Sequence, residues 1–203
     1  VTVGKRRYRV YGTTVKANDN VGIPLGIFYF SDLTMLYQVR DEYVRSRPVV
    51  SIILVDNYEE LTQNLSDGAI SALDAKINDA ILSWTENYHG LLRRLEKNRF
   101  LFVFEKRDLK GAKEGKFSLV EDMHELRGAG DASVSISFGL GVDGETFEES
   151  YGFATQAIDM ALSRGGDQAA IKTKNGYDFY GGVAKGVEKR TKVKTRIVAN
   201  ALL

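Results

Sequence analysis

Between residues 49 and 182, the hydrophobic positions follow the periods of strands and helices in turn. Val49–Val55 is a continuous apolar run, as expected of a strand that is buried on both faces. Ser66 and Asp67 then provide the N-cap of a long helix, along which apolar residues recur at steps of three and four. The same reasoning predicts strands at 91–95, 100–104 and 134–138, helices across 117–124 and 147–162, and a hairpin of 169–171 with 177–180.

The predicted order of elements is β-α-α-β-β-α-β-α-β-β, in which the first helix is a short stretch that starts after Asp56. A strand, a crossover helix, a hairpin, a second helix and a strand form the split βαβ arrangement of ferredoxin-like palm domains. The sequence therefore predicts an α+β fold, a ferredoxin-like palm with an antiparallel-rich sheet and helices.

The first 46 residues have a different pattern. Residues 5–30 predict two antiparallel strands, but a hairpin alone is only marginally stable in water, so we expect other strands or a partner to cover it. Asp32-Leu33-Thr34 is an N-cap signal, and the helix that follows must end before Pro48. We interpret this passage as a connector between two domains.

Composition narrows the class of protein. The chain has 203 residues, 28 Lys+Arg against 27 Asp+Glu, no Cys and two His. The formal net charge of +1 argues against a protein that binds nucleic acid through its global field, and the lack of cysteine excludes disulfides and thiolate zinc sites. No apolar run approaches the about 20 residues of a membrane span, and no signal peptide is visible. We expect a soluble, cytosolic body.

Two clusters of basic residues, at 5–9 and at 185–196, alternate with Val, Tyr or Thr. We interpret them as solvated faces of edge elements or linkers. A basic module that binds nucleic acid is the alternative, and a steep salt dependence of binding would favour it.

Palm domains of this order place nucleotide and metal chemistry at the end of the first strand and in the turn of the central hairpin. The acids at these places are Asp56 and Glu96, and Lys97 and Arg99 bring positive charge to the same turn. Because a pair of Mg²⁺ ions needs several converging carboxylates, this is a poor two-metal site. Asp56 is the one weak metal candidate, and it can alternatively cap the helix that follows it.

The positions of four other motifs in the predicted fold indicate what roles they can have. Lys97 with Asn98 could hold a phosphate, or form a solvated hairpin tip. The Gly-Gly-acid stretch 164–167 ends a helix, where paired glycines supply a left-handed C-cap. Residues 111–116 follow no apolar strand and lack the hydroxyl of a phosphate loop. His89 and His124 have no metal-ligand spacing, so we expect them to fill structural roles.

Several stretches together resemble the GdpP/YybT family of membrane-anchored bacterial cyclic-di-AMP phosphodiesterases. The most specific are Arg164-Gly165-Gly166-Asp167-Gln168-Ala169-Ala170-Ile171-Lys172 and the Phe179-Tyr180-Gly181-Gly182 hairpin that follows. The family chain carries two transmembrane helices, a PAS sensor, a degenerate GGDEF domain and a DHH-type phosphoesterase domain. The resemblance covers nearly all of the 203 residues.

The resemblance implies that diguanylate cyclase activity is lost. The usual Arg-x-Gly-Gly-Asp/Glu-Glu-Phe signature falls on residues 94–100, where Arg94 and Phe100 match but the glycines and both acids do not. The metal-binding aspartate falls on Leu54, and the residues that read guanine fall on Thr62 and Ser71. The degenerate signature is Glu96, Lys97, Asn98, Arg99 and Phe100.

The family implies a mainly regulatory domain with at most feeble ATP hydrolysis. The resemblance therefore gives a candidate site for Mg-ATP without catalytic residues, made of Asp56, Asn57, Arg94, Lys97 and Asn98. A weak ATPase, or a nucleotidyl cyclase in its own right, is the enzymatic alternative.

The resemblance also divides the chain. Residues 1–31 look like the last strands of a PAS domain, 32–46 like a signalling connector helix, 47–182 like the degenerate GGDEF domain and 183–203 like a basic linker. No Asp-His-His occurs, so we expect the DHH-type phosphoesterase domain after residue 203. Haem belongs to the PAS domain of the family and cannot be assigned here. The expected partners are the adjacent domains and a second copy in a homodimer, without nucleic acid, at the cytoplasmic face of the membrane and held there only by transmembrane helices outside this chain.

Overall fold

The computed structural model describes residues 1–16 and 24–181. The chain divides into two compact units, Val1–Ser46 and Arg47–Leu203. The predicted basic linker at 183–203 lies outside the described residues. Within the described ranges, no helix is long and apolar enough to cross a membrane.

The first unit is an antiparallel sheet followed by a helix. Strands β1 (Thr2–Val3), β2 (Arg6–Lys16) and β3 (Pro24–Asp32) pair in the order β1-β2-β3, which confirms the predicted hairpin. Helix α1 (Thr34–Ser46) begins where the Asp32 carboxylate accepts a hydrogen bond from the backbone N–H of Thr34, at 2.9 Å. None of the residues of α1 is buried within the described part of the chain.

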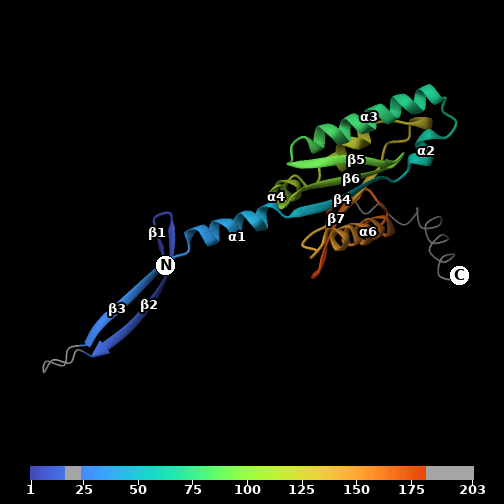
Figure 1. Ribbon diagram of the computed structural model, residues 1–203. Helices are drawn as coiled ribbons and strands as arrows, with labels where there is room; N and C mark the ends of the chain where they lie inside the picture. Colours follow the sequence, from blue (N-terminus) through green and yellow to red (C-terminus); the bar gives the residue numbers. More distant parts are fainter. Residues whose placement is uncertain (17–23, 182–203) are drawn as a thin grey trace, which may run out of the picture. The chain divides into compact units, whose positions relative to one another are not determined.

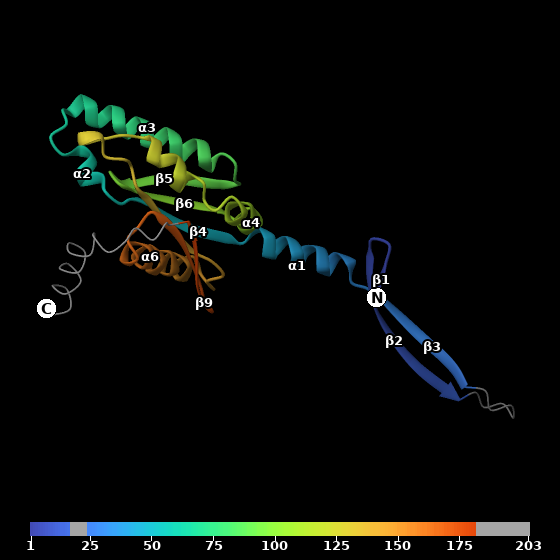
Figure 2. The same cartoon turned by 180° about the vertical axis from the view of Figure 1, so that it is seen from behind.

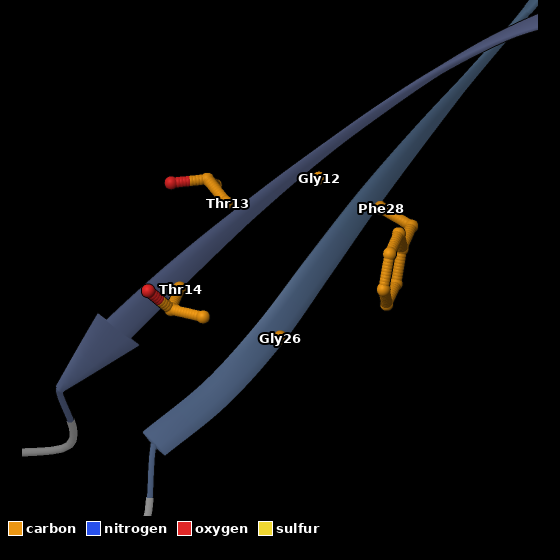
Figure 3. A pocket seen from close by; sticks show the side chains of 5 residues that line it. All are labelled: Gly12, Thr13, Thr14, Gly26 and Phe28. Atoms are coloured by element: carbon orange, nitrogen blue, oxygen red, sulfur yellow. The ribbon is translucent and has the colours of Figure 1, made fainter.

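The side chain of Phe28 is exposed on one face of this hairpin. A Cβ atom placed on Gly12 would lie 3.0 Å from the ring of Phe28, and one on Gly26 would lie 3.5 Å from it. Figure 3 shows the ring beside these two glycines, with Thr13 and Thr14 on the neighbouring strand. The resulting concavity is open and shallow, because the glycines contribute no side chains to its walls.

The second unit is a six-stranded sheet in the order β5-β6-β4-β7-β8-β9. All neighbours are antiparallel except β7 and β8, which are parallel. The first four strands in that order form the split βαβ arrangement, so the predicted palm fold is confirmed. The strands are β4 (Pro48–Val55), β5 (Gly90–Glu96), β6 (Arg99–Glu105), β7 (Ile136–Gly141), β8 (Gln168–Thr173) and β9 (Gly176–Gly181).

Helices cover both faces of the sheet, as Figures 1 and 2 show for α3 and α6. On one face, the side chains of Val49, Ile53 and Val55 join the larger core beneath α3 (Asp67–Thr85). On the other face, Val50 and Ile52 pack against α6 (Phe147–Ser163). The continuous apolar run of β4 therefore marks a strand that is buried on both faces, as predicted.

Helix α6 lies unusually close to the sheet because β7 presents glycines to it. A Cβ atom on Gly139 would lie 2.4 Å from the backbone oxygen of Ala154, and one on Gly141 would lie 1.8 Å from that of Ser150. Only glycine fits these positions without moving the helix, so the glycines of β7 set how closely α6 approaches the sheet.

The predicted helix across 117–124 is partly wrong. The main helix of this region is α4 (Lys106–Glu114), which buries Leu109 and Ala112. Lys116 and Phe117 then have φ angles of 49° and 55°, so they separate α4 from α5 (Leu119–Asp122) and from the 3₁₀ turns η1 (Met123–Glu125) and η2 (Ala129–Asp131). Helix α2 (Tyr58–Thr62) is the predicted short stretch after Asp56.

Candidate functional site

Four segments of the palm meet at one edge of its sheet, around Asp56. The backbone N–H of Val55, at the end of β4, donates to the carbonyl of Asn98 in the β5–β6 turn, at 2.8 Å. The next N–H, of Asp56, donates to the carbonyl of Ser135, just before β7, also at 2.8 Å. The turn between α6 and β8 reaches the same place through Asp167. We call this place the Asp56 corner; it comprises Asp56, Ser135, Ser137, Gly166 and Asp167.

The Asp56 carboxylate accepts hydrogen bonds from three donors that belong to two other segments of the fold. Its Oδ2 atom accepts hydrogen bonds from the hydroxyls of Ser135 and Ser137, at 3.0 and 2.8 Å, and from the backbone N–H of Asp167, at 3.0 Å. Its Oδ1 atom is buried and has no partner in the part of the chain that the structure describes. The carboxylate thus ties the end of β4 to β7 and to the α6–β8 turn.

The alternative role of Asp56 as a helix cap is wrong. Asn57 is the N-cap residue of α2, and the side chain of Asn57 makes no capping hydrogen bond. Its amide instead donates to the carbonyl of Ser133 at 2.9 Å and accepts from the N–H of Ser135 at 3.1 Å. Asn57 therefore fixes the segment that enters β7.

Burial raises the pKa of the Asp56 carboxyl, because the charged form loses contact with water. The hydrogen bonds from Asp167, Ser137 and Ser135 oppose this shift of the pKa, and the negative charge of Asp167 adds to it. The ionised carboxylate is held in place at a net electrostatic cost.

This pKa shift predicts how the stability of the palm depends on pH. Since the folded-state pKa of Asp56 lies above its ordinary value of 3.8, the folded state binds this proton more readily than the unfolded chain. The contribution of Asp56 to stability is then fully present below the ordinary value and is lost as the pH rises through the folded-state pKa. In urea unfolding between about pH 7 and about pH 4, the wild type should gain stability relative to Asp56→Asn as the pH falls. A difference that is flat or has the opposite slope would contradict this reading.

The glycines of the α6–β8 turn form the predicted left-handed C-cap of α6. Gly165 and Gly166 have φ angles of 111° and 72°, and their N–H groups donate to Leu162 and Ala161 at the end of α6. The second glycine has a further constraint, since a Cβ atom there would lie 2.5 Å from Oδ2 of Asp56. The stretch 164–167 is therefore a helix C-cap that also packs against the corner.

The two histidines have structural contacts, as predicted. Nε2 of His124 lies 2.5 Å from Oδ1 of Asp167, and Nδ1 of His89 lies 3.1 Å from Oδ2 of Asp108. The first contact extends the corner to η1. In the described ranges, no group of three or more His, Asp or Glu side chains is arranged to hold a metal ion.

Arg94 lies across the hairpin turn. Its Nε donates to the carbonyl of Glu96 at 3.2 Å, and its terminal nitrogen donates to the carbonyl of Lys97. The same guanidinium forms an ion pair with Asp74 of α3 at 3.2 Å and lies 5.3 Å from the centre of the Phe100 ring. Asp74 also accepts a hydrogen bond from the hydroxyl of Tyr58 at 2.9 Å. These contacts thus link α2, α3 and the β5–β6 hairpin to one another.

The other residues of the degenerate signature lie either in the core or in the β5–β6 turn. Phe100 is fully buried in the core, and Glu96 pairs with Arg99 across the turn, after a β-bulge. The side chains of Lys97 and Asn98 make no hydrogen bond or ion pair within the described residues, and Lys97 is exposed. Of the five candidate nucleotide-binding residues, Asp56, Asn57 and Arg94 are engaged inside the fold, while Lys97 and Asn98 have free side chains at the turn.

The residues present do not fit a pair of metal ions. Leu54 supplies no ligand atom, and one oxygen of Asp56 already accepts three hydrogen bonds while the other is buried. The nearby turn offers Lys97 and Arg99, which repel a divalent cation. What this edge of the palm can offer a ligand is the ammonium group of Lys97 and the amide of Asn98 in the β5–β6 turn beside the corner.

Sequence reasoning missed the partners of Asp56, which are Ser135, Ser137 and Asp167. Serines at every second position of an otherwise apolar strand, from Ser133 to Ser137, are a signal that one face of that strand is polar. The pattern alone does not say which carboxylate these hydroxyls meet.

Comparison with known proteins places this geometry in a family. A family profile described as "Cyclic-di-AMP phosphodiesterase GdpP-like, GGDEF domain" matches residues 53–179. The cyclic-di-AMP phosphodiesterase GdpP of Bacillus subtilis (strain 168) is 32% identical over 203 residues, which are 100% of this chain and 29% of that protein. The GdpP of Geobacillus thermodenitrificans (strain NG80-2) is 35% identical over 177 residues, which are 87% of this chain and 27% of that protein. The chain thus spans less than a third of the length of these relatives.

Solved structures share the fold at low identity. The active GGEEF domain of a diguanylate cyclase from Vibrio cholerae has a TM-score of 0.54 at 15% identity, covering 68% of this chain and 91% of that chain. The FimX GGDEF domain of Pseudomonas aeruginosa has a TM-score of 0.52 at 16% identity, covering 68% and 92%. The palm is therefore a GGDEF fold. Together with the match over residues 53–179, this shows that the chain belongs to the family of GdpP-like GGDEF domains of cyclic-di-AMP phosphodiesterases.

Proposed function

We propose that this chain is the regulatory region of a cyclic-di-AMP phosphodiesterase, with a GGDEF-like palm that has lost diguanylate cyclase activity. The observation that carries the proposal is the state of the Asp56 corner. A cyclase of this fold needs metal-bound triphosphate at the end of the first strand. Here Leu54 stands near that end of β4, and the carboxylate of Asp56, which follows the strand, is bound inside the fold.

In this proposal the chain transmits a signal. Residues 1–31 are the end of a PAS domain, and α1 connects that domain to the palm. The full protein acts at the cytoplasmic face of the membrane as a homodimer, and its phosphodiesterase domain follows the palm. Family membership and the fraction of the relatives that this chain spans support this arrangement.

The test has two parts. The purified chain, incubated with Mg²⁺ and GTP or ATP, should form no cyclic dinucleotide, as measured by mass spectrometry. In the full-length protein, deletion of α1 should uncouple the phosphodiesterase rate from the state of the sensor domain. Cyclic-di-GMP made by the purified chain, or unchanged coupling after the deletion, would refute the proposal.

Weak binding of ATP at the hairpin tip is a second candidate function, and the free side chains of Lys97 and Asn98 favour it. An ammonium group and an amide, both unengaged, can meet a phosphate as a point charge and a hydrogen-bond donor. Because Lys97 is exposed, the triphosphate of ATP would stay in contact with solvent at this site. The affinity for ATP should therefore be low and should fall as the salt concentration rises.

Calorimetry tests this second candidate. The combined substitution Lys97→Ala and Asn98→Ala should abolish ATP binding, whereas Lys110→Ala, an exposed lysine of α4, should leave the affinity unchanged. Equal affinity in the doubly substituted chain and the wild type would remove the hairpin tip as the site.

A further inference from the structure

Arg99, the first residue of β6, has a buried donor without a partner. Its Nε–H is shielded from water and makes no hydrogen bond with any residue that the structure describes. The residue as a whole is half-buried. Because an unsatisfied buried donor on a charged group costs free energy, such a group in a folded protein indicates that a ligand, a water molecule or an ion completes its bonds.

The neighbours of Arg99 do not neutralise its charge. Leu54 lies directly opposite on β4, and Glu96 lies opposite on β5. Since residues opposite one another on antiparallel strands share a face of the sheet, Arg99 shares its face with an apolar side chain. Glu96 is exposed, and within the described ranges no ion pair joins it to Arg99. Asp56 accepts its hydrogen bonds from other donors.

Leu54 and Arg99 occupy two positions that carry acids in the GGDEF signature. The metal-binding aspartate falls on Leu54, and the second acid of the signature falls on Arg99. The register of β4 with β6 places these two residues opposite each other. A pair of carboxylates that could hold a divalent cation is therefore replaced by an apolar side chain and a permanent positive charge.

The turn before Arg99 is held by hydrogen bonds to its carbonyls. The guanidinium of Arg94 donates to the carbonyl of Lys97, and the N–H of Val55 donates to the carbonyl of Asn98 at 2.8 Å. The backbone that carries Lys97, Asn98 and Arg99 is thus fixed before any ligand arrives. Binding at such a turn costs little backbone freedom.

Phosphate oxygens are the ligand atoms that match these three side chains. Lys97 offers an ammonium group, Asn98 an amide N–H and Arg99 a planar fork of N–H donors. The Cα atoms of Lys97 and Arg99 are at most about 7 Å apart, because only one residue separates them. Both long side chains can therefore reach one chain of linked phosphates.

We propose that Lys97, Asn98 and Arg99 bind the phosphate chain of a nucleoside triphosphate directly, without a divalent cation. The guanidinium of Arg99 supplies there the positive charge that a metal ion supplies in a cyclase of this fold, and the bound phosphate completes the bonds of its Nε–H. The inference rests on the second candidate function, binding of ATP at the hairpin tip, and adds to it a third residue and independence from metal.

Mg²⁺ should weaken this binding. Apart from the Arg94–Asp74 ion pair, residues 93–99 hold three bases and one acid, so their field favours the most negative form of the ligand. Because Mg²⁺ binds the phosphates of ATP in solution, it lowers the negative charge that the turn can attract. A site that depends on metal would show the opposite response.

Calorimetry of the whole chain measures this response. ATP is titrated in EDTA and again in excess Mg²⁺, while inorganic triphosphate and adenosine are titrated in EDTA. We expect ATP and inorganic triphosphate to bind in EDTA, adenosine to show no binding, and ATP to bind more weakly in Mg²⁺. The three probes separate recognition of the phosphates from recognition of the base.

Arg99→Gln tests the arginine itself. Loss of the guanidinium should weaken the binding of ATP in EDTA by about tenfold or more, since hydrogen bonds from charged groups are the strong ones. Arg45→Gln is the matched control, because it removes the same charge from an exposed arginine of the other unit, and it should leave the affinity unchanged. An equal loss of affinity in both variants would show a general effect of net charge and refute the assignment of Arg99.

Thermal unfolding separates a binding residue from a structural one. Arg99→Met removes the unsatisfied donor and keeps a long side chain, so without ligand its melting temperature should be no lower than that of the wild type. ATP in EDTA should raise the melting temperature of the wild type but not that of the variant. A melting temperature well below that of the wild type would mean that Arg99 stabilises the fold through its own contacts, which would overturn the proposal.

The inference and the candidate function can fail separately. Binding of ATP only in the presence of Mg²⁺ would overturn the metal-independent site and leave the candidate function in place. Binding in EDTA that Arg99→Gln leaves unchanged would restrict the site to Lys97 and Asn98, against this inference. No binding of ATP in either condition would refute both.

Discussion

Gly166→Ala should destabilise the palm by about 3 kcal/mol or more, in spite of the small size of the added group. The residue has a φ angle of 72°, which an L side chain adopts only at a cost. Its Cβ atom would also lie 2.5 Å from Oδ2 of Asp56, the atom that three donors already surround. Urea unfolding measures the loss in the free energy of unfolding.

The neighbouring glycine is the matched control for this prediction. Gly165 has a φ angle of 111°, but a Cβ atom there meets nothing within 4 Å. Gly165→Ala should therefore cost only the backbone strain, about 1–2 kcal/mol. Combining Gly166→Ala with Asp56→Ser should recover part of the loss, which a double-mutant cycle detects as coupling. Equal losses for the two glycine variants would show that the contact between the turn and Asp56 is not tight.

The corner explains why an acid at the end of the first strand need not mean a metal site. A carboxylate can bind a divalent cation only with oxygen lone pairs that are accessible. Those of Asp56 are taken up by Ser135, Ser137 and the N–H of Asp167, or are shielded from solvent. The same residue type thus serves the architecture of the fold, by joining three segments that are distant in the sequence.

The sequence predicted the palm well where burial sets the pattern of a whole element. Val49–Val55 and the stripes of α3 and α6 each match the period of the structure that they form. Helix α4 was missed because only Leu109 and Ala112 are buried among its many charged residues. The break after it depends on positive φ angles at Lys116 and Phe117, which no residue-type preference indicates.

The location of the candidate site could be predicted from the sequence, but the hydrogen-bond partners of its residues could not. The end of β4 and the β5–β6 turn do meet, as palm topology requires, through the hydrogen bond from Val55 to Asn98. The partners of Asp56 lie 79 to 111 positions further along the chain, so only the folded register brings them together. Arg94 was assigned to a nucleotide from its place in the signature, while its contacts with Asp74 and with two backbone carbonyls are local features of the folded turn.

Arg94→Ala should cost about 2 kcal/mol of stability, because it removes a charged donor from two carbonyls and leaves a half-buried Asp74 without its ion pair. Arg93, the neighbour on the exposed face of β5, makes no hydrogen bond or ion pair with the residues that the structure describes. Arg93→Ala should therefore change stability by about 0.5 kcal/mol or less. Thermal and urea unfolding of the two variants measure the difference.

The same pair of variants decides what Arg94 does at the turn. If its role is to hold the hairpin against α3, Arg94→Lys should recover little of the lost stability, because a lysine cannot reach two carbonyls and a carboxylate with fixed geometry. Any ATP affinity of the chain should then fall only as far as the hairpin loosens, and Asp74→Asn should produce a similar fall. If Arg94 instead binds phosphate directly, Arg94→Ala should abolish the affinity while Asp74→Asn, which frees the guanidinium, raises it. The sign of the Asp74→Asn effect on ATP affinity therefore separates a structural arginine from a ligand-binding one.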